Sequence, residues 1–185
     1  MRLILACIFF SISFGLAAQI DSVELKKRWL VGGNGQIYLE KIGANTGRLI
    51  VIAEPQAGYF FSNSWMAGLR APMSFFSNEY KIATQPFVRF YVPIKGHVIP
   101  FIEANIGYEW RVIINVTEAP NNLDKSFLYG TRAGGAFFLN QNISIDLFLY
   151  YSGQNSRYKN GETGEVSDPL LKQYFGIGAG FQIYL

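Results

Sequence analysis

The stretch FGIGAGFQIYL, residues 175–185, alternates between two kinds of residue with a period of two. One parity is apolar from Phe175 to Leu185, and the other holds three glycines, Gln182 and Tyr184. Because successive side chains of a β-strand point to opposite faces, this pattern predicts a strand with one apolar face and one nearly bare face. Glycine costs backbone entropy in a strand and offers nothing to pack, so one face of this strand must require small residues.

The same period of two recurs through the chain, and no stretch with helical spacing competes with it. Turn residues separate eight such segments, so we expect an all-β fold. The segments span residues 28–40, 48–61, 64–75, 82–94, 98–115, 127–139, 143–152 and 171–185.

The connections between these segments alternate in length. Short ones fall at residues 62–63, 95–97 and 140–142, and longer polar ones at 41–47, 116–126 and 153–170. The exception is the brief third-to-fourth connection, SNEYK. Tight turns at one end and longer loops at the other are typical of an eight-stranded antiparallel up-and-down transmembrane β-barrel.

The N-terminal MRLILACIFFSISFGLAAQ has the order of a secretory signal peptide, with Arg2, then an apolar run, then small residues. We expect residues 1–18 to be cleaved, after Ala17 or Ala18, leaving 19–185 as one domain. The only cysteine, Cys7, would leave with the signal, so disulfides are not expected in the mature chain.

The amino-acid composition limits the class of protein to which this chain can belong. Charged residues make up 16% of the chain, below the ~25% of soluble domains, while aromatic residues reach 16% and there are 19 glycines. Without Arg2, 15 basic residues face 13 acidic ones, and no basic patch suggests nucleic acid. Since no long apolar run follows the signal, the chain is either a soluble all-β protein or a membrane barrel.

The position of the charges decides between these two. In segment 98–115, Ile102 and Ile106 alternate with Glu103 and Glu109, and in the other strands charge again opposes the apolar row. The polar row is rich in glycine and mixed charge, which suits the crowded lumen of a small barrel. A membrane barrel is therefore favoured, and a soluble periplasmic ligand-binding barrel remains the alternative.

Aromatic residues near the strand ends are typical of interfacial girdles. They are Trp29, Tyr59, Phe60, Phe61, Trp65, Phe75, Phe76, Tyr80, Trp110, Tyr151 and Tyr184.

Six stretches of the chain carry a resemblance to a known family: VGGNGQIYLEK, EPQAGYFF, TQPFVRFYVP, PFIEANIGYEW, RAGGAFFLNQNISIDLFL and FGIGAGFQIYL. Through them the whole mature chain resembles the small eight-stranded outer-membrane barrels, the class of OmpX and the OmpA membrane domain. The resemblance implies an outer-membrane location after export, and a last strand that serves as the signal for the barrel-insertion machinery. The residues so assigned are Phe175, Ile177, Phe181, Ile183, Tyr184 and Leu185. Such strands usually end in an aromatic residue, whereas this one ends in Leu185.

Charges assigned to the lumen must be paired, because isolated buried charges are costly to desolvate. We expect a salt-bridge network that plugs the barrel; the alternative is a gate whose arginines and glutamates exchange partners to pass small ions. The network is predicted to comprise Glu54, Arg70, Arg89, Glu103, Glu109, Arg111, Arg132 and Asp146, with Glu40 also facing inward.

The role predicted from these features is structural or surface-interacting, with the loops, above all residues 153–170, as binding elements. A lipid-modifying enzyme is disfavoured, because the only histidine, His97, lies in a short turn and no catalytic motif appears. No cofactor or metal is expected. The expected partners are outer-membrane lipid, lipopolysaccharide, the insertion machinery and an extracellular ligand, with no nucleic acid and a monomeric barrel.

Overall fold

The computed structural model describes residues 24–42, 46–76, 79–94, 96–113, 124–156 and 170–185. The predicted signal peptide and most of the loop at 153–170 therefore lie outside the described residues. No helix in the described ranges is long and apolar enough to cross a membrane. The strands are β1 (Trp29–Ile42), β2 (Thr46–Phe60), β3 (Trp65–Arg70), β4 (Met73–Phe76), β5 (Glu79–Tyr91), β6 (Val98–Ile113), β7 (Asp124–Asn140), β8 (Ile143–Ser156) and β9 (Leu170–Tyr184).

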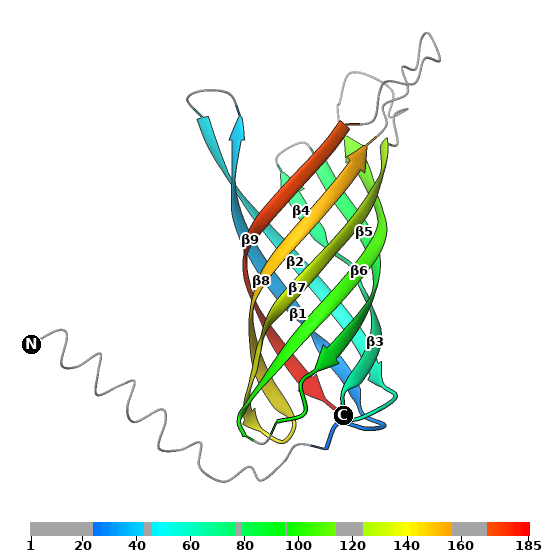
Figure 1. The fold of residues 1–185 in the computed structure, drawn as a ribbon. Helices are drawn as coiled ribbons and strands as arrows, with labels where there is room; N and C mark the ends of the chain where they lie inside the picture. Colours follow the sequence, from blue (N-terminus) through cyan, green and yellow to red (C-terminus); the bar gives the residue numbers. More distant parts are fainter. Residues whose placement is uncertain (1–23, 43–45, 77–78, 95, 114–123, 157–169) are drawn as a thin grey trace, which may run out of the picture.

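These strands form one closed antiparallel barrel (Figure 1). Apart from β3 and β4, each strand pairs with its neighbours along the chain. The barrel is closed by β1 and β9, which pair from Leu30↔Tyr184 to Ile37↔Ile177. Both β3 and β4 pair with β2 on one side and β5 on the other, so they are two pieces of one barrel strand. The barrel is therefore eight-stranded, which confirms the predicted fold.

The predicted third strand, residues 64–75, is interrupted at Ala71 and Pro72. Proline has no N–H to donate to a ladder, and at Pro72 the pairing is interrupted, although Pro55, Pro86 and Pro100 are accommodated inside strands. Backbone bonds still hold the interruption on both sides. The Ala71 N–H donates to the Pro55 carbonyl at 3.0 Å, and the Ala83 N–H donates to the Pro72 carbonyl at 2.9 Å.

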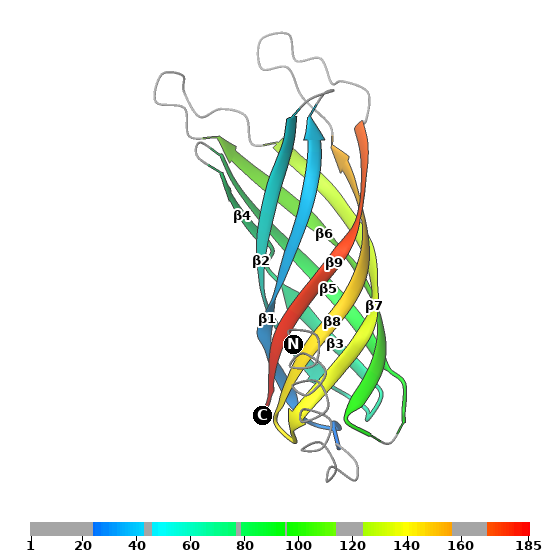
Figure 2. The ribbon, with the colours of Figure 1, turned by 90° about the vertical axis from the view of Figure 1, so that its left-hand side faces the viewer.

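The three tight connections, β2–β3, β5–β6 and β7–β8, lie at one end of the barrel together with the C-terminus (Figure 2). We call this end the turn end, and the opposite end the loop end. Toward the loop end the β1–β9 register stops at Ile37↔Ile177, and the β1–β2 hairpin leans out of the wall (Figure 1).

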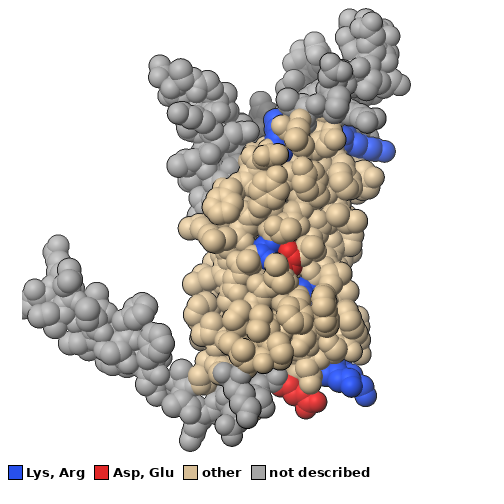
Figure 3. Space-filling model, viewed as in Figure 1, with Lys and Arg blue, Asp and Glu red and all other residues tan. Residues whose placement is uncertain are grey.

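The two faces of the wall differ as predicted. Outward residues such as Ile102 and Ile177 are 56% and 67% exposed, whereas Glu103 and Asp146 are 1% and 0% exposed. On the face seen in Figure 3 the wall is mostly uncharged between its two ends, apart from a small group of blue and red atoms near mid-height. The apolar parity therefore faces outward and the charged parity faces the lumen, the reverse of a soluble barrel.

Candidate functional site in the barrel lumen

The glycine parity of β9 makes room for side chains from neighbouring strands. A Cβ at Gly178 would lie 2.5 Å from the Phe148 ring, and one at Gly176 would lie 2.7 Å from the Tyr150 hydroxyl. Gly180 is likewise covered by the Asn34 side chain of β1. The glycine face of β9 therefore faces the lumen, where rings from β8 and the Asn34 side chain from β1 lie against it.

The lumen near the turn end is filled by an aromatic layer, which consists of Phe60, Tyr91, Phe101, Phe138 and Tyr184. Ring centroids lie 4.9 Å apart for Phe138 and Tyr184, and 5.3 Å for Phe60 and Tyr91. The prediction that Phe60 and Tyr184 belong to an outer girdle is wrong, because both share the inward parity of their strands and are fully buried. Their shared parity with the luminal residues was the feature of the sequence that could have predicted this inward position.

The segment before β1 covers this layer at the turn end. Leu25 is 1% exposed and packs with the aromatic layer. Lys27 adopts a positive φ of 67°, and its N–H donates to the Phe60 carbonyl at 2.9 Å. The Arg28 guanidinium then donates to the carbonyls of Gln141 and Tyr184, at 2.6 and 2.8 Å. The segment thus joins the barrel seam to the β7–β8 turn.

A charge layer lies next to the aromatic layer, and Glu103 of β6 is at its centre. Its carboxylate accepts from Arg70 Nη2 and, at 2.9 Å, from Arg89 Nε, and the Nε atom of Arg132 lies 3.5 Å away. Three guanidinium groups from three strands therefore surround one carboxylate.

Two further carboxylates complete the charge layer. Asp146 Oδ2 accepts from Arg89 Nη1 at 2.7 Å, while its other oxygen accepts from the Ser144 hydroxyl at 2.9 Å. Glu54 Oε2 lies 2.8 Å from Arg132 Nη2. Three positive and three negative side chains are thus paired among themselves, as buried charges require.

Aromatic faces support the same arginines. The guanidinium carbons of Arg70, Arg89 and Arg132 lie 4.8, 4.2 and 4.8 Å from the ring centroids of Phe87, Phe101 and Phe148, respectively. A guanidinium over an aromatic face gains a cation–π attraction that grows when the pair is desolvated. The rings therefore hold the arginines on their inward side.

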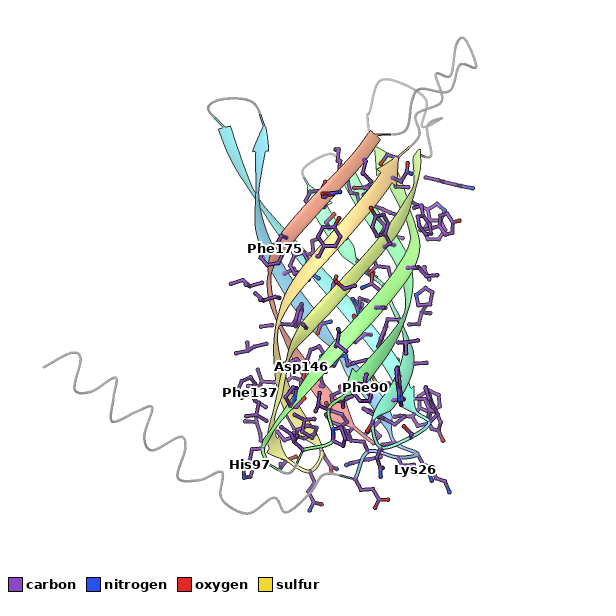
Figure 4. All side chains as sticks on the ribbon, viewed as in Figure 1. Lys26, Phe90, His97, Phe137, Asp146 and Phe175 are labelled. Atoms are coloured by element: carbon purple, nitrogen blue, oxygen red, sulfur yellow. The ribbon has the colours of Figure 1, made fainter. Side chains whose placement is uncertain are left out.

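Six of the eight predicted luminal charges lie together in this layer. Glu109 lies nearer the loop end, where it accepts from Gln154 Nε2 at 2.8 Å. The side chains of Arg111 and Glu40 lie outside the described ones. Asp146 is seen inside the barrel in Figure 4, whereas Phe137 and Phe175 project outward.

Sequence reasoning missed a ring of three amides beside the charge layer. Asn34 donates to Gln56 at 3.1 Å, Gln56 donates to Gln182 at 3.0 Å, and Gln182 donates back to Asn34 at 3.0 Å. Gln36 adds a 2.7 Å bond to Glu54. Inward parity placed each amide in the lumen, but their joining across the β1–β9 seam depends on the closed barrel.

Five of the residues assigned to the insertion signal lie on the outer face, which leaves them accessible from outside the barrel. The fully buried Tyr184 points inward, and its hydroxyl lies 3.1 Å from that of Ser144. The insertion role stays a prediction. The exposed five are Phe175, Ile177, Phe181, Ile183 and Leu185.

The lumen toward the loop end holds a polar cavity of about 90 Å³. Its lining includes Glu54 and Arg132 of the charge layer, Tyr150 of β8, and Lys81 and Glu109. Within the described residues, no group of histidine, cysteine, aspartate or glutamate is arranged to hold a metal ion.

Solved structures of outer-membrane barrels share this fold. Neisserial surface protein A is similar with a TM-score of 0.60 and 11% identity, over 84% of this chain and 96% of its own. The N-terminal β-barrel domain of Pseudomonas aeruginosa OprF also gives 0.60, with 12% identity over 86% and 98%. OprG from Pseudomonas aeruginosa gives 0.54, with 13% identity over 89% and 99%.

No family model and no curated protein matches the sequence. At these identities the likeness shows the fold alone, which is that of the small outer-membrane barrels.

Proposed function

We propose that this protein is an integral outer-membrane barrel that does not conduct ions at rest and that presents its loop end to the exterior. The exposed apolar wall and the charged lumen support the membrane placement. The N-terminal signal pattern supports export, with the turn end in the periplasm and the loop end outside. Outer-membrane lipid and lipopolysaccharide would then surround the wall, and the insertion machinery would act on β9.

The observation that carries the proposal is the filling of the lumen by two successive layers. The buried rings of the aromatic layer close the turn end, and the charge layer next to them is internally neutral and paired. An ion would have to displace both layers in order to cross. The function of the barrel is therefore assigned to its surface and loops, with residues 153–170 as the binding segment. The barrel is proposed to act as a monomer.

Fractionation with heat modifiability tests the placement. We expect the protein in the outer membrane, with a mobility on detergent gels that shifts when the sample is boiled. A soluble periplasmic species without a shift would contradict the proposal.

Planar-bilayer recording tests the resting state. Purified barrel is expected to give no channels at moderate voltage, and steady unitary currents from the unmodified protein would contradict this.

Replacing residues 157–169 by a short turn should leave the heat shift intact while removing binding to whole cells or lipopolysaccharide. Retained binding would remove the loop from the proposal.

A narrow gated pore is the second candidate, and the shared carboxylate of Glu103 favours it. Because three arginines surround it, one of them can leave for Asp146 or Glu54 without losing all of its charge pairing. A pore predicts rare openings whose frequency changes in Arg89→Gln or Glu103→Gln. If neither the unmodified barrel nor these variants conducts, the gate is excluded.

The proposal includes no catalytic step. His97 lies in the β5–β6 connection at the turn end (Figure 4), away from the polar cavity. A serine nucleophile requires a base within hydrogen-bond reach. Lipid hydrolysis by the purified protein in mixed micelles would contradict this part of the proposal.

A further inference from the structure

The seam between β1 and β9 is paired over only part of its length. Pairing ends at Ile37↔Ile177, although β1 continues to Ile42 and β9 begins at Leu170. Over the same stretch β1 stays paired with β2, and β9 with β8. Within the described residues, the facing edges of β1 and β9 therefore have no partner strand there, and the two strands diverge in Figure 1.

The alternation of backbone hydrogen bonds shows which groups lack a partner. Trp29 and Leu185 exchange two backbone bonds, at 3.0 and 2.8 Å. Such doubly bonded pairs recur at every second position of an antiparallel ladder. Counted along the same register, Leu39 and Phe175 would form the first doubly bonded pair beyond the end of the pairing. The backbone N–H and C=O of Phe175 thus point toward β1 and meet no strand in the described part of the chain.

This part of β9 still belongs to the apolar wall. Leu171 and Phe175 are 54% and 72% exposed, and Phe175 projects outward in Figure 4. In lipid no water can bond to unpaired backbone groups, which is why strands cross a membrane only as closed barrels. An open seam at this height is therefore costly, and further pairing of β1 with β9 would remove the cost.

The residues on the two edges suit such further pairing. On the luminal face, the last two paired side chains of β1 each lie opposite a glycine of β9. These pairs are Asn34↔Gly180 and Gln36↔Gly178. If the register continued, Tyr38 would fall opposite Gly176, the remaining glycine of that row. On the outer face, Leu39 would fall opposite Phe175, so that an apolar residue again meets an apolar one.

The polar cavity borders the open part of the seam, because Gln36 and Tyr174 belong to its lining. We propose that the seam is a two-state element, open toward the loop end in this structure and closed when the same register continues, beginning with Tyr38↔Gly176 and Leu39↔Phe175. Closing bonds the Phe175 backbone and completes the wall beside the cavity. The inference rests on the proposed membrane placement, since lipid supplies the drive for closing.

Cysteine cross-linking in phosphatidylcholine vesicles tests this inference, on the mature barrel made from a Cys7→Ser chain. Leu39→Cys with Phe175→Cys reports the closed state. Ile37→Cys with Ile177→Cys, which are paired in the structure, is the upper control, and Leu39→Cys with Ile177→Cys is the diagonal control. Residues directly opposite have Cβ atoms about 4.5–5.5 Å apart, whereas diagonal neighbours are about 7–8 Å apart.

Under mild oxidation, the rate of disulfide formation reflects the fraction of barrels in the closed state. We expect the pair at 39 and 175 to react at least about threefold more slowly than the upper control and at least about tenfold faster than the diagonal control. A rate no higher than the diagonal control would overturn the closed state. A rate equal to the upper control would mean that the seam is always closed, which would overturn the two-state element.

Each double variant is first shown to keep the heat-dependent gel shift, so that a lack of cross-linking is separated from a loss of fold. If the pair at 39 and 175 does not fold, Lys41→Cys with Gln173→Cys takes its place at the next doubly bonded position, with the same two controls. Fractionation tests the membrane placement independently. A barrel found in the outer membrane whose seam never cross-links beyond Ile37 would overturn this inference alone.

Discussion

Glu103 is the residue on which the charge layer depends, because it is the shared partner of Arg70 and Arg89 and lies close to Arg132. Glu103→Gln would leave buried arginine charge without compensation. Breaking a buried ion pair from one side costs about 3–5 kcal/mol, so we expect a loss of that order in the free energy of unfolding. Urea unfolding in lipid vesicles, followed by gel mobility, measures it.

Glu109→Gln is the matched control for this prediction. It makes the same change on the same face of β6, at a half-buried position near the cavity mouth. We expect a loss below about 1 kcal/mol there, because a solvated charge has little to lose from neutralisation. Equal losses at the two positions would show that Glu103 does not organise the layer.

The adjacent glycines of β7 give a second comparison at the residue scale. A Cβ at Gly134 would lie 2.1 Å from the Leu147 carbonyl oxygen on β8, whereas at Gly135 the nearest atom would be Val98 Cγ1 at 3.2 Å. Gly134→Ala must therefore move the β8 backbone, and we expect it to cost about 1–3 kcal/mol.

Gly135→Ala should cost clearly less, since a single side-chain methyl can give way. Urea unfolding of the two variants in the same vesicles makes the comparison. If Gly135→Ala proved the more harmful, the inward and outward assignment of β7 would be wrong.

At the scale of the element, the seam between β1 and β9 is held at the turn end by Arg28. Arg28→Gln would lose charge-assisted bonds to the carbonyls of Gln141 and Tyr184, each of a kind that contributes about 1.5–3 kcal/mol. We expect the amides of Trp29 and Leu185, which bond each other across the seam, to exchange hydrogen at least tenfold faster.

Lys26→Gln is the control for the seam, because Lys26 donates to Asn63 Oδ1 from its backbone N–H, which the substitution keeps. Hydrogen exchange at the seam amides should stay unchanged in that variant. Exchange that is equally slow in both variants would show that Arg28 does not hold the seam.

The strands themselves were predictable because a period of two survives from one end of the domain to the other. The break at Pro72 was not, because a proline in an alternating run is compatible with a strand end, a bulge or an edge. The aromatic layer could have been predicted, because Phe60 and Tyr184 share the parity of the luminal residues. The amide ring of Asn34, Gln56 and Gln182 was not, because it needs the closure register of β1 with β9.

At the scale of the whole molecule, the two luminal layers block the same path one after the other. Opening one layer should therefore leave the barrel silent in planar bilayers. Phe60→Ala with Phe138→Ala removes rings from the aromatic layer. Arg70→Gln with Glu103→Gln removes one positive and one negative charge, so the remaining charge layer stays balanced at two against two.

We expect neither double variant to conduct and the quadruple variant to give small steady channels, because only the quadruple variant opens both layers. Ile102→Ala with Leu147→Ala, on the outer wall, controls for general loosening and should stay silent. Full conductance from the aromatic double variant alone would show that the charge layer passes ions freely. The barrier would then belong to the rings and to Leu25, and the paired charges would serve only to hold the strands together.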